Sequence, residues 1–199
     1  MSGLIQDPTA RRIVYAPMQP PEAFPAFPAM DFDQAVRHFR WFVGQAPERV
    51  QQLRTAYAAT ANDPRDLDFS GGSLTALWRW VAARVEVVPA LDAGPPSPAW
   101  ARRVGDPERR LSPATLALAV DAGFYLAGVF RERHATIHWE LWTRTKGAYW
   151  NRPVLAGFGP YPFVPHDHVA MGMWRLADDR YEETHLLKTF ATWEQMIGP

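Results

Sequence analysis

The sequence predicts an α+β fold: a small, mostly antiparallel sheet covered by helices, with a helical N-terminal half. One observation is a nearly continuous apolar segment at 116–130, because a helix that is apolar almost all round is a buried helix. Another is a pair of strand-like segments, 137–143 and 152–158, separated by a turn at Lys146-Gly147. We therefore expect one buried central helix, at about 113–134, packed on a hairpin.

The first 30 residues are rich in proline, with six prolines interleaved with Phe24, Phe27 and Met30. Proline fixes φ and removes a backbone donor, so regular structure is not expected there. We interpret residues 1–30 as an extended arm whose phenylalanines lie against the body, and residues 31–199 as a single globular α+β domain. The alternative is a flexible proline-rich tail that another domain recognises.

Apolar residues at helical spacing predict three helices in the N-terminal half. Asp31 is a good N-cap for the first, whose apolar stripe runs through 32–46. Pro47 fits the first turn of the second helix, which the sequence Asn62-Asp63-Pro64 ends. The third helix begins at Ser73 or three residues earlier.

A connection at 89–111, rich in proline, glycine and arginine, separates the third helix from the central one. It is longer than most loops of compact domains, and such loops tend to be functional or mobile. Ser112-Pro113 then form a good N-cap and first position for the central helix. After the hairpin the chain breaks at 160–165, and two terminal helices are predicted near 168–176 and 183–197.

Composition is that of an ordinary globular protein, with 47% hydrophobic and 21% charged residues. The absence of cysteine excludes disulfides, thiolate metal ligands and a cysteine nucleophile. No secretion signal is recognisable, and Asp121 interrupts the most apolar stretch before it reaches the roughly 18 residues of a membrane span. We expect a cytoplasmic protein without a membrane partner. The preference for arginine over lysine is typical of GC-rich bacterial genomes.

The chain has 21 basic and 21 acidic residues. Up to Arg110 there are 13 basic and 12 acidic residues, and after it 8 and 9. Neither half carries the basic excess with which proteins neutralise phosphates and release counterions. We therefore do not expect nucleic-acid binding.

Most histidines lie in the last third of the chain: His134, His138, His166, His168 and His185. His166-Asp167-His168 would place two imidazoles on one side of an extended segment, a spacing that metal sites use. The third candidate ligand is His138, with His134 or His185 as alternatives, and the candidate catalytic base is Glu140 or Asp167. No H-E-x-x-H motif is present. In the alternative interpretation, Asp167 and His168 cap the following helix.

The turn of the hairpin is basic and aromatic. Its candidate binding residues are Trp142, Arg144, Lys146, Tyr149, Trp150, Asn151 and Arg152. Arginine and tryptophan dominate the hot spots of protein interfaces. Alternation along the first strand also places His138, Glu140 and Trp142 on one face, where an acid/base pair could lie beside a stacking surface. The alternative is a solvent-facing sheet surface whose aromatic residues shield a short sheet.

Asp121 interrupts the central apolar helix, and a buried, unpaired carboxylate would be costly. Its helical neighbours Leu118, Tyr125, Gly128 and Glu132 form the least apolar stripe of that helix. We therefore expect Asp121 to be partly exposed or to pair with an arginine of the 89–111 connection.

No motif identifies a reaction, because the glycines at 157–159 and the serines at 70–73 fit neither a phosphate-binding loop nor a nucleophile elbow. We expect a non-catalytic bacterial cytoplasmic protein-interaction module without a cofactor, such as an immunity protein that neutralises a toxin. Its protein partner would bind the 142–152 hairpin, with a possible contribution from the connection at 89–111; a homodimer is compatible with the sequence.

Two other functions stay open. One is a metal-dependent hydrolase that uses the C-terminal histidines. The other is a small-ligand-binding protein in which Trp142, Trp150 and Arg152 hold an anionic or planar molecule between helix and sheet.

Overall fold

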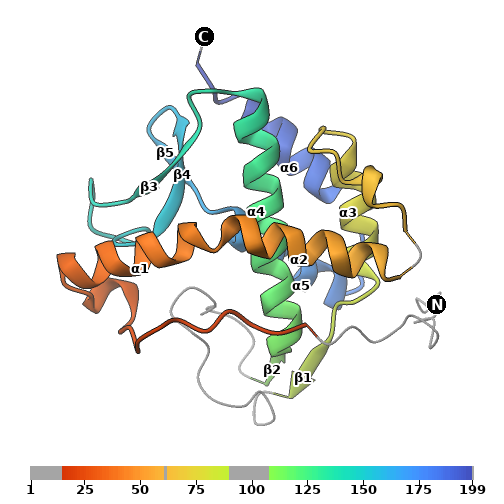
Figure 1. Ribbon diagram of the computed structural model, residues 1–199, viewed down its shortest axis with the longest axis horizontal. Helices are drawn as coiled ribbons and strands as arrows, with labels where there is room; N and C mark the ends of the chain where they lie inside the picture. The colour runs from red at the N-terminus through yellow and green to blue at the C-terminus, as the bar shows by residue number, and fades with distance from the viewer. Residues whose placement is uncertain (1–14, 61, 90–107, 199) are drawn as a thin grey trace.

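A computed structural model describes residues 15–60, 62–89 and 108–198 of the chain, and the long helix α4 (Pro113–Arg133) lies at its centre (Figure 1). The other helices are α1 (Phe32–Gly44), α2 (Ala46–Ala58), α3 (Ser73–Ala82), α5 (Pro165–Ala177) and α6 (His185–Glu194), with short 3-10 turns η1 (Phe27–Ala29) and η2 (Pro64–Asp66). The strands form two small antiparallel sheets. The predicted α+β class and helical N-terminal half are therefore confirmed.

The larger sheet has the order β3-β4-β5, with β3 (His138–Leu141), β4 (Pro153–Phe158) and β5 (Tyr161–Phe163). The two predicted strands are confirmed as β3 and β4, which pair in the register Trp139↔Leu155. The strand β5 lies where the sequence predicted only a break. It is three residues long with a central proline, so pairing with β4, and not local propensity, makes it a strand.

The second sheet pairs β1 (Val87–Pro89) with β2 (Arg109–Leu111). Strand β2 is the end of the segment 89–111 that the sequence predicted as an irregular connection, and β1 overlaps the start of that segment at Pro89. The prediction was wrong there, because two three-residue strands carry no periodicity of their own. The rest of the connection, including Trp100, lies outside the described residues.

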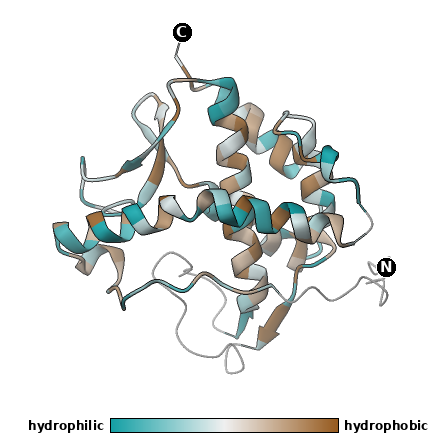
Figure 2. Cartoon of the chain, viewed as in Figure 1, coloured by the Kyte–Doolittle hydropathy of each residue, from teal (hydrophilic) through white to brown (hydrophobic). Residues whose placement is uncertain are grey.

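Helix α4 is the predicted buried central helix. Ser112 caps it by accepting the Thr115 N–H at 3.2 Å, and 14 of its 21 residues are buried. Its length and apolarity would suffice to cross a membrane in spite of Asp121, so the sequence argument against a span was wrong on that point. In the structure 78% of the apolar window is buried inside the protein, as in a core helix. Figure 2 shows α4 and β4 as largely hydrophobic, whereas the face of α2 turned to the viewer is hydrophilic.

Gly123 lets α5 pack closely on α4. A Cβ atom at Gly123 would lie 2.7 Å from the backbone nitrogen of His166, which is closer than real Cβ contacts allow. Gly123 belongs to a stripe of small residues, with Ala119 and Ala127 four positions away on either side. The contact fixes the start of α5 against the middle of α4.

Residues 15–30, without regular structure apart from η1, run along the body beneath α1 and α2 (Figure 1). Met18, Phe27 and Met30 are buried there with Phe42 and Phe124, and Phe24 is half-buried against the same cluster. Apolar burial therefore holds this part of the proline-rich segment in place.

The last two helices appear close to where they were predicted. However, α5 begins at Pro165, so His166, Asp167 and His168 form part of its first turn and are not extended. The extended segment that the metal-site hypothesis required does not form, because Pro165 is well suited to the first position of a helix.

Candidate functional site

Asp121 is fully buried in the middle of α4, contrary to the expectation of partial exposure. Its partner is also not an arginine of the 89–111 connection: Arg49 of α2 donates through Nε to Oδ1 at 2.7 Å. The Tyr15 hydroxyl donates to the other carboxylate oxygen. Burial raises the pKa of Asp121 to about 6, although both hydrogen bonds favour the charged form. The carboxylate is satisfied by protein groups on both oxygens, so we assign it a structural role.

The candidate metal ligands do not meet. His138 is exposed and hydrogen-bonds the Thr136 carbonyl at 2.9 Å, whereas His166 is buried beside Phe42. His168 packs against Phe163 and Trp193 instead. Within the described ranges no group of three His, Asp or Glu side chains is arranged to hold a metal ion. His166 and His168 diverge because side chains two residues apart on a helix point in directions that differ by about 200° around the helix axis.

A buried histidine that the sequence argument passed over, His38 of α1, also packs against Phe42. The ring centroids of His38 and His166 are 6.0 and 5.5 Å from that of Phe42. His38 Nδ1 and His166 Nε2 have no hydrogen-bond partner among the described residues. Burial lowers the pKa of both histidines to about 4, which keeps them neutral at pH 7.

Both candidate catalytic bases are held in ion pairs. Arg144 donates to the two oxygens of Glu140 at 3.0 and 2.9 Å, and Arg152 Nη2 lies 2.9 and 2.8 Å from the two oxygens of Asp167. His138 Nε2 is 3.7 Å from Glu140, so these two side chains share a face as predicted. A base already bound by an arginine on both oxygens is poorly placed to take a proton from a substrate.

Three of the seven predicted hairpin residues face the interior and cannot form the recognition surface that was expected of them. Trp142 is buried with Val154 and Val164. The amide of Asn151 is also buried, and donates to the carbonyl oxygens of Phe27 and Met30 at 3.1 and 2.9 Å. Arg152 is mostly buried against Phe27, as well as paired with Asp167.

The other predicted residues stay at the surface, on the hairpin tip, which we define as residues 143–150. Arg144, Lys146 and Tyr149 are exposed, and Trp150 is half-buried with Lys146 Nζ 5.9 Å from its ring. Two backbone hydrogen bonds close the base of the tip, from Trp142 N to Arg152 O at 3.0 Å and from Asn151 N to Trp142 O at 2.9 Å. The tip is therefore an exposed loop on a fixed base.

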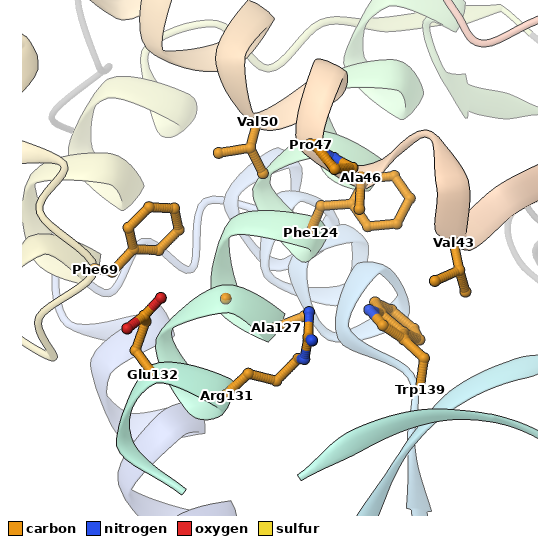
Figure 3. Close-up of a pocket in the computed structure, with 11 residues that line it drawn as sticks. Val43, Ala46, Pro47, Val50, Phe69, Phe124, Ala127, Arg131, Glu132 and Trp139 are labelled. Atoms are coloured by element: carbon orange, nitrogen blue, oxygen red, sulfur yellow. The ribbon is translucent and has the colours of Figure 1, made fainter. Parts of the chain in front are cut away.

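A groove of about 460 Å³ lies between α4, the junction of α1 and α2, and strand β3 (Figure 3). Phe124, Val50 and Trp139 supply much of its apolar wall. Arg131 and Glu132, in the last turn of α4, border it. Sequence reasoning missed this groove because its walls come from segments that are far apart in the chain.

Phe69 closes one side of the groove in a backbone conformation that is unusual for a bulky residue, with φ of 63°. Its N–H donates to the Tyr125 hydroxyl at 2.8 Å, and its ring stacks on that of Tyr125 at 4.6 Å. Gly128 makes room for it, since a Cβ there would lie 2.6 Å from the Phe69 ring. Such strained residues persist only where their surroundings enforce them, and they are common at ligand sites.

No protein-family model matches the chain, and no curated protein or solved structure shows a significant similarity to it. The geometry of the hairpin tip and of the groove is therefore the basis of the functional proposals below.

Proposed function

We propose that the protein is a non-catalytic binding module whose protein partner contacts the hairpin tip, residues 143–150. One observation carries the proposal: the tip exposes basic and aromatic side chains on a base that buried Trp142 and Asn151 fix in place. Binding residues are often presented in this way, on a loop that a rigid scaffold positions.

A preformed loop binds with a smaller loss of conformational entropy than a flexible one. Tyrosine and arginine are enriched in interfaces because each combines a large contact area with polar groups. The tip contains no acidic residue and two basic ones, Lys146 and Arg144, of which Arg144 is paired with Glu140 at the edge of the tip. Its partner is therefore expected to present an acidic surface with an apolar centre.

Phe32 is a further candidate for the contact with the partner. Its side chain is at the start of α1 and is 65% exposed, the largest value among the large apolar residues of the described chain. It lies two positions after Met30, whose carbonyl oxygen accepts from Asn151 at the base of the tip. An exposed phenylalanine is a suitable apolar anchor for a partner.

Site-specific photo-crosslinking in cells tests this proposal. A benzophenone amino acid in place of Tyr149, which is 40% exposed, is expected to give one discrete adduct with a partner protein. The matched control is the same replacement at Tyr161 of β5, which is 59% exposed and lies at the opposite end of β4. Addition of Lys146→Glu and Phe32→Ser should abolish the adduct from position 149. Equal adducts from both positions, or an adduct that survives these changes, would contradict the proposal.

A further inference from the structure

We propose that the groove between α4, the α1–α2 junction and β3 binds a small, planar, apolar molecule that carries one anionic group. The anionic group would bind Arg131, and the apolar body would lie against Phe124, Val50 and Phe69. This site shares no residue with the hairpin tip, so it stands or fails independently of the proposed protein partner.

The size and lining of the groove fit a small molecule. Its volume of about 460 Å³ is within the range of known ligand pockets, about 300–1,000 Å³. Aromatic rings contribute from three sides, with Phe124 on α4, Trp139 on β3 and Phe69 before α3 (Figure 3). Aromatic walls favour a flat ligand, because stacked or edge-on rings gain energy beyond burial of area.

The charged residues at the edge of the groove, Arg131 and Glu132, indicate which polar group a ligand would carry. Neither Arg131 nor Glu132 is ion-paired or hydrogen-bonded through its side chain to a described residue, whereas their neighbour Arg133 pairs with Glu194. Figure 3 shows Arg131 extending toward Trp139, and Glu132 directed to the Phe69 side. An anion is therefore attracted to the Trp139 end and repelled from the other.

Fold stability does not account for Glu132. A helix C-terminus carries partial negative charge, so an acidic residue in the last turn of α4 is unfavourable there. Phe69, on the same side of the groove, has a strained backbone. Glu132 and Phe69 are therefore two residues at this groove whose conformation or charge is unfavourable for the stability of the fold. We infer that Glu132 restricts the ligand to a single anionic group.

Two fluorescent probes test the site on the full chain. 8-Anilinonaphthalene-1-sulfonate carries a planar, apolar naphthalene ring and one anionic group, and N-phenyl-1-naphthylamine is the same molecule without the sulfonate. Arg131→Met should weaken binding of the sulfonate about tenfold, the usual value of one charge-assisted contact, and change binding of the neutral probe less than about twofold. Glu132→Gln should tighten the sulfonate about twofold, because a like charge is removed. Val50→Phe fills the groove from α2 and should weaken both probes more than about tenfold.

Arg133→Met is the matched control, since it removes a positive charge from the same helical turn outside the groove, and it should leave both affinities unchanged. Thermal melts confirm that each variant is folded. Sulfonate binding that is insensitive to Val50→Phe would place the probe elsewhere and overturn the proposal. Equal effects of Arg131→Met on both probes, or of Arg131→Met and Arg133→Met on the sulfonate, would overturn the anion assignment.

Discussion

Arg49 and Asp121 form a buried ion pair that joins α2 to α4, with side-chain exposures of 8% and 0%. The other two nitrogens of Arg49 also donate: Nη2 to the Ala16 carbonyl at 3.0 Å and Nη1 to the Gln52 side chain at 2.9 Å. The pair thus fixes two helices and the extended segment at Tyr15 and Ala16 in one network. Because both charges are removed from water, each needs the other to offset the cost of its burial.

We expect Asp121→Ala to lower the free energy of unfolding by about 3–5 kcal/mol, since it leaves the Arg49 guanidinium buried without its counter-ion. Urea unfolding followed by circular dichroism measures this. The double variant Arg49→Met with Asp121→Leu should recover much of the loss, because apolar residues of similar volume often replace a buried pair at little cost. An effect of Asp121→Ala below about 1 kcal/mol would contradict the structural role.

Stability should fall between pH 6.5 and pH 4. Burial lowers the pKa of His38, His166 and His168 to about 4, so over this range the unfolded chain binds more protons than the folded one. Each histidine then contributes a loss of up to roughly 1.4 kcal/mol per pH unit as the pH falls. Asp121 acts in the opposite direction below about pH 6, because its pKa is raised to about 6, and offsets about one histidine.

Urea titrations at pH 7, 6 and 5 measure this slope. In the variant His38→Leu with His166→Leu the slope should be much smaller, because neither side chain takes up a proton on unfolding. A stability that stays constant over this range in the unmodified protein would show that these histidines are not buried as described.

Gly123→Ala should destabilise the protein by about 1–3 kcal/mol or more, because the new Cβ would meet the backbone of α5 at 2.7 Å. Gly44→Ala is the matched control. A Cβ at Gly44 has no neighbour within 4 Å, and alanine is the better helix former, so a gain of about 0.5–1 kcal/mol is expected at this terminal position. Thermal unfolding distinguishes the two, and equal effects would disprove the close approach of α4 and α5.

Asn151 has two structural roles: its side chain donates hydrogen bonds, and its backbone adopts a positive φ. Different substitutions separate these roles. Asn151→Gly keeps the backbone conformation, whose φ is 61°, but loses the bonds to Phe27 and Met30. Asn151→Ala loses those bonds and also strains the backbone, and should cost about 1 kcal/mol more than glycine. Hydrogen exchange at the hairpin tip should accelerate in both variants, whereas unchanged protection would show that Asn151 does not fix its base.

The helices were predictable because their signals are local. Asp31 caps α1 through a reciprocal pair of bonds with Gln34, and Ser112 with Pro113 begins α4, as the sequence indicated. The strands β3 and β4 followed from alternation and a turn. Strand β5 and the β1–β2 pair were missed, because three-residue strands are defined by their partners.

The candidate site was less predictable. The hairpin was singled out because its turn is basic and aromatic, but composition does not show which of its side chains turn inward. Trp142 and Asn151 were expected to bind a partner, and the structure uses them to build the loop. The groove gave no sequence signal, since apolar residues at helical spacing look the same whether they fill a core or line a cavity.

The sequence by itself determined the helices and the main hairpin of this protein, because caps, periodicity and turns act over a few neighbouring residues. Tertiary structure decided the partner of Asp121, the inward turn of Asn151 and the meeting of Phe69 with Gly128. These contacts join residues far apart in the chain: Arg49 and Asp121 are 72 positions apart, and Phe27 and Asn151 are 124 positions apart. The physical reason is that burial and charge pairing depend on which surfaces meet when the helices pack around α4, and no local pattern records that choice.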